Sequence, residues 1–335
     1  MDRMSTNTQK PEVQRPSKGS KVLKGVPAQE LGVILILIVL MVVLGATAGE
    51  KFLNQNTMFN MVRNFSWIAM AGFGELLVII IAGIDLSVGS TMALAGLISA
   101  ELLVNQFPVP IAVIGGLMGG LLVGLINGLL VSKGRLPAFI ATLGMMSVVR
   151  GVVYGSTHGQ PVMNLPVGFM NLGRIDIPII GLKVPLPVIL MLSIALLVHI
   201  FLSRTVWGYR IYALGGNEQS TRLSGVNTTQ MKLLVFTLAG ILAATGGIVM
   251  TARLGVAMPN AALGYELDVI AAVFIGGAST SGGSGTILGV LIGAAIMQVL
   301  RTGMVLLGID PYWQNAAIGC VILISLMIDQ LRRRQ

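Results

Sequence analysis

Charged side chains are scarce in this sequence. Only 10% of its 335 residues are Asp, Glu, Lys or Arg, whereas 54% are hydrophobic; a soluble domain usually carries about 25% charged residues. This shortage argues against a soluble enzyme, a disordered chain and a nucleic-acid-binding protein. A membrane-spanning helix needs about 20 mostly apolar residues, so about ten spans would leave too few residues for a second folded domain.

Cysteine and the common catalytic motifs are also missing. Cys320 is the single cysteine, which rules out an internal disulfide. No Gly-Lys pair occurs, so there is no phosphate-binding Walker A loop, and neither a Gly-x-Ser-x-Gly nor a His-Glu-x-x-His motif is present. The two histidines, His158 and His199, are expected in an outer loop and at the end of a span, not at a metal site. The sequence therefore predicts a protein that is not an enzyme and that itself binds no metal or cofactor.

Long apolar runs are what the sequence does have, and they predict an all-α, polytopic membrane protein. Residues 1–30 contain six basic and three acidic residues and are expected to form a disordered cytoplasmic arm. Residues 31–330 are the expected single transmembrane domain, and 331–335 a basic cytoplasmic tail. About ten spans, some of them short or broken helices, are predicted at residues 31–49, 65–84, 86–104, 110–131, 137–154, 185–203, 232–252, 266–280, 286–304 and 312–330.

The distribution of the basic residues, which give the chain its net charge of +9, predicts the orientation of these spans. Basic residues gather in the cytoplasmic loops of membrane proteins. With the N-terminus inside, the predicted spans place 15 of the 22 Lys and Arg residues in cytoplasmic segments. The sequence therefore predicts that both termini are cytoplasmic.

The sequence also contains a weak internal repeat. A shift of 194 residues aligns 81–98 with 275–292 and gives seven identities in 18 positions. In the predicted arrangement of spans the two copies would run in the same direction, whereas transporters often contain inverted repeats. The relation between the two halves therefore stays open.

Two segments of this repeat, 83–90 and 276–285, interrupt apolar runs with Gly, Ser and Thr and, in the first, with Asp85. Lipid cannot satisfy free backbone groups, so one interpretation is a pair of broken helices that line a cavity. Short aqueous turns between helical hairpins are the alternative. Both interpretations predict non-helical segments that face the transport route or the cytoplasmic surface.

Ionisable residues inside the predicted spans are candidates for function. A charge in the bilayer is costly and usually faces the interior of a helix bundle. Glu75 falls in the middle of one span, and Glu266 and Asp268 begin another. Each of them, like Asn127, could serve transport or act only as a structural hydrogen-bond or ion-pair partner.

Glycines at intervals of four residues predict close helix packing, because small side chains let backbones approach. One such stripe could slide against its neighbour, although static packing is the simpler interpretation. The stripes contain Gly116, Gly120, Gly124 and Gly128, and then Gly285, Gly289 and Gly293.

The most polar internal stretch, residues 212–230, lies in the longest predicted cytoplasmic loop. A Gly-Gly pair stops the preceding structure, Asn217 can cap a helix, and Glu218 to Leu223 form a short amphipathic turn that ends at Gly225. Such a turn can be a simple connector or a docking element for another protein.

Four motifs resemble the permease subunits of bacterial ABC importers for monosaccharides, of the ribose-permease type. They occur in the order of that family and extend over nearly the whole chain beyond the first 30 residues. The first and the last distinguish sugar permeases from the related branched-chain amino-acid permeases. The motifs are GIDLSVG at 83–89, PAFIATLG at 137–144, ALGGNEQSTRLSG at 213–225 and GYELDVIAAVFIGGASTSGG at 264–283.

The resemblance implies a transmembrane permease of the bacterial inner membrane that works as a pair, either two copies or one copy with a paralogue. A cytoplasmic subunit with two ATP-hydrolysing domains, often fused in one polypeptide in this family, would bind ATP and Mg²⁺, and a periplasmic sugar-binding protein would deliver the substrate. The residues that match the coupling helix of such permeases are Asn217, Glu218, Thr221, Arg222, Leu223, Ser224 and Gly225.

The candidate translocation pathway combines polar residues of the spans with residues of the motifs. Hydroxyl and amide groups suit a neutral sugar, which needs hydrogen bonds and no fixed charge. The candidates are Glu75, Asp85, Ser87, Asn127, Phe139, Thr142, Tyr265, Glu266, Asp268, Ser279 and Ser281. A secondary transporter driven by an ion gradient through Glu75 and Asp268 is the alternative function. The sequence leaves the identity of the sugar open.

Overall fold

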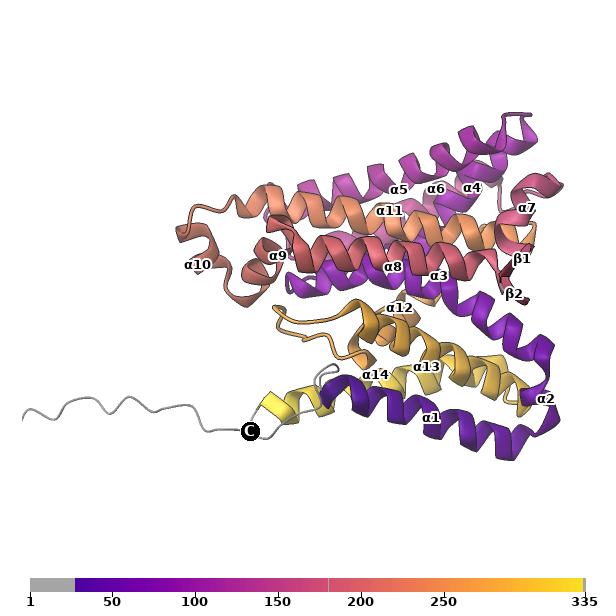
Figure 1. Cartoon of the computed structure of the whole chain (residues 1–335). Coiled ribbons are helices and arrows are strands. Elements are labelled where there is room, and N and C mark those ends of the chain that lie inside the picture. The colour runs from indigo at the N-terminus through magenta and orange to yellow at the C-terminus, as the bar shows by residue number, and fades with distance from the viewer. Residues whose placement is uncertain (1–27, 180, 334–335) are drawn as a thin grey trace, which may run out of the picture.

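The computed structural model describes residues 28–179 and 181–333, and they form a bundle of helices with one small hairpin (Figure 1). In chain order the elements are α1 (Ala28–Ala48), α2 (Glu50–Leu53), α3 (Gln55–Ile80), α4 (Val88–Val104), α5 (Val109–Ser132), α6 (Ala138–Thr157), α7 (Val167–Arg174), β1 (Asp176–Ile179), β2 (Leu182–Pro185), α8 (Leu186–Arg204), α9 (Val206–Gly216), α10 (Glu218–Leu223), α11 (Thr228–Leu254), α12 (Tyr265–Ile275), α13 (Ile287–Leu306) and α14 (Pro311–Arg333). Strands β1 and β2 pair antiparallel, with Asp176 opposite Pro185.

The all-α, polytopic membrane fold predicted from the sequence is confirmed. Within the described part of the chain, seven helices are long and apolar enough to cross a membrane: α1, α3, α5, α6, α8, α11 and α13. Helix α4 and the apolar part of α14 are shorter, and α12 has only 11 residues. The structure therefore supports many crossings but does not establish a count of ten.

Three helix ends differ from the boundaries expected from the sequence. The span expected at 266–280 ends at Ile275, because the Gly-rich segment 276–286 that follows cannot continue a helix at its positive φ angles. Helix α1 begins at Ala28, so the last residues of the expected arm are helical; the rest of that arm lies outside the described residues. Helix α14 continues to Arg333, so the tail expected from residue 331 begins within it.

Helix α11 lies at the centre of the bundle and packs against α3, α4 and α5. Glycine permits its approach to α5: a Cβ atom on Gly120 would collide with the carbonyl oxygen of Gly240, and one on Gly240 with that of Gly120. Gly116, Gly124 and Gly128 face similarly crowded positions. The four glycines at 116–128 thus lie on one face of α5 against its neighbours, the geometry that close helix contact in lipid requires.

The second glycine stripe is shorter than expected. Cβ atoms on Gly289 and Gly293 would collide with the carbonyl oxygens of Gly276 and Ala272, so these two glycines let α13 approach α12. Gly285, however, precedes α13 and has a φ of +154°. The helix starts only after Thr286, whose side chain caps it by accepting the N–H of Gly289 at 3.0 Å. Gly285 is therefore not part of a helical stripe.

The two ends of the bundle differ (Figure 1). Helices α9 and α10, the start of α1 and the end of α14 lie at one end, and α2, α7 and the hairpin lie at the other. Arg63 of α3 forms an ion pair with Asp176 of β1 at 2.5 Å, which fastens the hairpin to the bundle. Because α9 and α10 belong to the predicted cytoplasmic loop, we call their end the α10 end and the opposite one the hairpin end.

Candidate functional site

Five of the candidate pathway residues meet in one place. Glu75 of α3, Asp85 and Ser87 of the segment after α3, Asn127 of α5 and Thr142 of α6 form what we call the buried polar cluster. Each of the five is at most 4% exposed. Four separate parts of the chain thus place their polar side chains together inside an otherwise apolar bundle.

Hydrogen bonds connect the members of the cluster in series. The Asp85 N–H donates to Glu75 Oε1 at 3.1 Å. Asp85 Oδ1 accepts the Ser87 N–H at 2.8 Å and the Ser87 hydroxyl at 2.6 Å. Ser87 Oγ in turn accepts Asn127 Nδ2 at 2.9 Å. The segment that the sequence interprets either as a broken helix or as an aqueous turn is therefore a buried turn held by polar side chains.

Thr142 attaches the turn to α6. Its hydroxyl accepts the N–H of Leu86 at 3.1 Å and lies 3.0 Å from the carbonyl oxygen of Ile84, to which it can donate. Thr142 is part of the PAFIATLG motif and Asp85 of the GIDLSVG motif. Two motifs that are about 50 residues apart in sequence are thus joined by hydrogen bonds between the Thr142 hydroxyl and the backbone of the turn.

The buried polar cluster retains hydrogen-bonding capacity. Glu75 Oε2 and Asn127 Oδ1 are buried and accept no hydrogen bond within the described part of the chain. Neither Glu75 nor Asp85 forms an ion pair with a described basic residue. A buried polar atom without a partner is costly, so the cluster offers acceptors that a hydroxyl-bearing ligand or a proton can satisfy.

A second group lies in α12 and α13. Asp268, fully buried, forms an ion pair with Arg301 at 2.6 Å, and the Arg301 guanidinium lies 5.1 Å from the centre of the Tyr265 ring. Glu266 points elsewhere: its Oε1 accepts the N–H of Gly264 at 3.2 Å. Arg301 was not among the candidates, although an arginine in an apolar run is the signal that could have found it.

The remaining pathway candidates lie apart from both groups. Ser279 and Ser281 belong to the segment 276–286, where the Ser279 N–H donates to the Ser284 carbonyl oxygen at 3.1 Å. Phe139 is 51% exposed on the surface of α6. The eleven candidates are therefore distributed over several regions and do not form one continuous site.

The candidate coupling residues form the short exposed helix α10. Asn217 caps it, since its side chain accepts the N–H of Ser220 at 2.8 Å, and Gly225 follows it with a φ of +83°. Glu218 forms an ion pair with Lys232 of α11 at 2.7 Å rather than with Arg222. Leu223 is 79% exposed. The other residues of the set are Thr221, which is buried, and Ser224.

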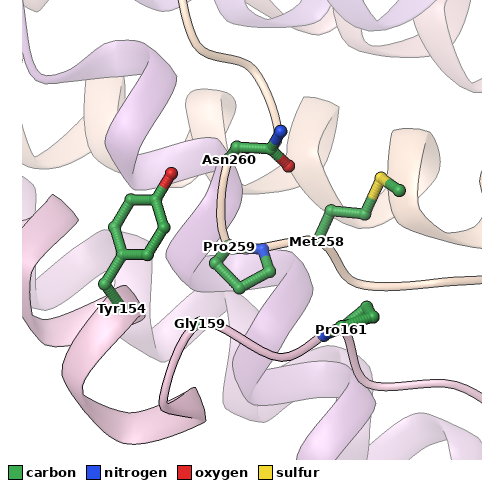
Figure 2. Close-up of a pocket in the computed structure, with 6 residues that line it drawn as sticks. All are labelled: Tyr154, Gly159, Pro161, Met258, Pro259 and Asn260. Carbon is green, nitrogen blue, oxygen red and sulfur yellow. The ribbon is translucent and has the colours of Figure 1, made fainter.

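A small pocket opens at the hairpin end of the bundle (Figure 2). It encloses about 220 Å³ between the end of α6 and the segment after α11, with Tyr154 on one side and Pro259 and Asn260 on the other. Arg150 fixes that segment by donating to the carbonyl oxygens of Pro259 at 3.0 Å and Ala261 at 2.8 Å. No sequence motif indicates this pocket, because its walls come from the end of α6, the loop after it and the segment after α11, which share no pattern.

Known proteins are similar to this chain over most of its sequence. The family model described as branched-chain amino acid transport system / permease component matches residues 57–326. The ribose import permease protein of Escherichia coli strain K12 is 41% identical over 305 residues, which are 89% of this chain and 93% of that protein. The D-allose transport system permease protein of the same strain is 36% identical over 90% of this chain and 91% of its own length.

A third relative, the fructose import permease protein of Rhizobium meliloti, is 34% identical over 90% of this chain and 85% of its own length. The match to the family model and these relatives cover most of the bundle, including both motifs of the buried polar cluster and α10. The chain therefore belongs to this family of transport-system permease components, as a multi-pass membrane subunit of a transporter rather than an enzyme.

Proposed function

We propose that the chain is the transmembrane permease subunit of an ATP-binding-cassette importer that moves a monosaccharide into the cytoplasm. The observation that carries the proposal is the similarity, over about nine-tenths of the chain, to permeases named for ribose, D-allose and fructose import. A pentose, a hexose or a related polyol is therefore the expected substrate class.

The partners follow from this function. An ATPase subunit, with two nucleotide-binding domains fused in one chain, binds ATP and Mg²⁺ and docks at the α10 end, which faces the cytoplasm of the bacterial cell. A periplasmic sugar-binding protein delivers substrate at the hairpin end. A second permease, either another copy of this chain or a paralogue, completes the pathway across the inner membrane.

The buried polar cluster suits a neutral substrate. Its unpartnered oxygens on Glu75 and Asn127 can accept hydrogen bonds from sugar hydroxyls when the bundle opens. Asp268 is less suited to an ion-driven mechanism, because Arg301 already neutralises it. The ion pair of Asp268 argues against one of the two carboxylates of the ion-gradient alternative. Glu75, whose free oxygen accepts either a sugar hydroxyl or a proton, does not distinguish the two mechanisms.

The test is uptake of radiolabelled sugars into proteoliposomes that contain the permease, the ATPase and the binding protein. We expect uptake of at least one monosaccharide that requires ATP and the binding protein. Omission of the ATPase is the matched control. Uptake that continues without the ATPase and follows an imposed ion gradient would establish the alternative and overturn the proposal.

Docking of the ATPase at α10 is tested separately with Arg222→Glu. This exposed residue lies on α10 outside the membrane-spanning helices, so the variant should still insert and assemble. We expect weaker capture of the ATPase and loss of sugar-stimulated ATP hydrolysis, because charge reversal at an interface introduces repulsion. Lys51→Glu, at the hairpin end, is the control; normal capture by Arg222→Glu would make α10 a mere connector.

A further inference from the structure

Helix α9, which directly precedes α10, meets two other segments backbone to backbone. A Cβ atom on Gly215 would collide with the carbonyl oxygen of Ile80, the last residue of α3, and would lie 2.7 Å from the backbone nitrogen of Gly283. The Gly283 N–H itself donates to the Ile80 carbonyl oxygen at 2.8 Å. The Tyr212 hydroxyl donates to the carbonyl oxygen of Gly285 at 2.8 Å. We call these five residues the α9 junction.

The α9 junction continues directly into the buried polar cluster. Ile80 is followed by the turn that carries Asp85 and Ser87, and the chain at Ala82 has a φ of +59°. Gly282, in the segment 276–286, lies against this turn: a Cβ atom there would be 2.9 Å from the nitrogen of Ala82. A displacement of Ile80 therefore changes the position of Asp85, whose N–H is hydrogen-bonded to Glu75.

The other side of the α9 junction leads to α10. Asn217 alone separates α9 from α10, and its side chain caps α10. Helix α10 also contacts α11, where Glu218 pairs with Lys232. A force applied to α10 by a docked protein thus passes into α9, and from α9 into the end of α3 and the segment 276–286.

The segment 276–286 can change conformation without strain in its side chains. Gly277, Gly282, Gly283 and Gly285 have φ angles of +91°, +80°, +75° and +154°. Glycine takes positive and negative φ with similar ease, and hinges are commonly a few such residues between packed elements. The segment extends past the ends of α12 and α13 toward α9, as Figure 1 shows.

We propose that the α9 junction transmits movement of α10 to the buried polar cluster, with Tyr212 and Gly215 as its positioning residues. The inference rests on the proposed function, since it needs an ATPase that moves α10. Direct backbone contact at Gly215 leaves no flexible side chain to absorb a displacement. The Tyr212 hydrogen bond makes the segment 276–286 move together with α9. The end of α3 is then displaced both by Gly215 of α9 and by Gly283 of that segment.

Two matched pairs of variants test the proposal in the full complex of permease, ATPase and sugar-binding protein. Gly215→Ala has its control in Gly216→Ala on the same helix, where a Cβ atom meets nothing within 4 Å. Tyr212→Phe, which removes only the hydroxyl, has its control in Tyr209→Phe, whose side chain is 65% exposed on α9. Capture of the ATPase, ATP hydrolysis with and without loaded binding protein, and sugar uptake are measured for each.

We expect all four variants to capture the ATPase normally. Tyr212→Phe should lower both sugar uptake and the stimulation of ATP hydrolysis by about threefold or more, the effect of one lost hydrogen bond, and Gly215→Ala should lower them further. Both controls should behave as the unaltered protein.

Equal uptake and stimulation in Tyr212→Phe and Tyr209→Phe would overturn the proposal, and this pair stays informative if Gly215→Ala does not assemble. Loss of ATPase capture by Tyr212→Phe would also overturn it, because the residue would then serve docking instead of transmission. If the unaltered complex shows no ATP-dependent uptake, the proposed function itself fails, which is a distinguishable result.

Discussion

Ser87 shows how much a single hydroxyl contributes to the site. It donates to Asp85 Oδ1 at 2.6 Å and accepts from Asn127 Nδ2 at 2.9 Å, so it connects a side chain of the turn with one of α5. The residue types of this cluster were foreseen from the sequence, because carboxylate, hydroxyl and amide groups in apolar runs are unusual. Their pairing was not, since it depends on how α3, α5 and α6 pack.

Replacement of Ser87 by Ala should therefore destabilise the permease. The variant removes the hydroxyl that accepts from Asn127 Nδ2 and donates to Asp85 Oδ1, and a buried polar group that loses a partner costs about 1–3 kcal/mol. Thermal unfolding of the purified protein in detergent measures the effect. Ser193→Ala is the control, because the Ser193 hydroxyl is exposed and donates to a carbonyl oxygen of its own helix, that of Ile189, at 2.8 Å. Equal unfolding temperatures for the two variants would contradict the prediction.

At the scale of elements, the spacing of glycines predicts one helix contact well and another only in part. The stripe on α5 depends on local geometry, because residues four apart share a face of any α-helix. The stripe that includes Gly285 depends on where α13 begins. That point is set by Thr286, whose hydroxyl donates to Glu30 of α1 at 2.7 Å. A contact between residues 256 positions apart is not visible in a local pattern.

Substitution of glycine by alanine should have opposite effects on stability at two positions, one at the α5–α11 contact and one on α6. Gly→Ala in a helix usually stabilises it by about 1 kcal/mol. Gly120→Ala should instead destabilise the protein, because the added Cβ collides with the carbonyl oxygen of Gly240. Gly144→Ala on α6 meets nothing within 4 Å and should be neutral or stabilising. The two variants are compared by the yield of monodisperse protein after detergent extraction and by the unfolding temperature. If Gly120→Ala is at least as stable as Gly144→Ala, α5 and α11 pack less closely than the Gly120–Gly240 contact indicates.

At the scale of the whole molecule, composition and the long apolar runs together predict the fold class, because only 10% of the residues are charged and runs of about 20 apolar residues can cross lipid as helices with their backbone groups satisfied internally. The sequence also predicts the non-helical nature of both glycine-containing segments, which holds for 276–285 and for 83–87, whereas Val88 to Ser90 of the first segment already belong to α4. The mutual contact of the two segments, through Gly283 and Ile80, is not predicted. The weak repeat relates the two segments by sequence but does not say that they touch, since that contact needs α9 and the end of α3 in their folded positions.

The orientation of the molecule in the membrane is tested with single cysteines. Cys320, which is exposed, is first replaced by Ser to remove the background. Lys51→Cys at the hairpin end and Leu223→Cys at the α10 end then probe the two faces, and both native side chains are exposed. If basic segments face the cytoplasm, a membrane-impermeant maleimide added to spheroplasts should label position 51 at once and position 223 only after the membrane is disrupted. The opposite order of labelling would place α10 outside the cell, where no ATP-hydrolysing subunit could reach it, and the coupling through α9 would have no source of energy.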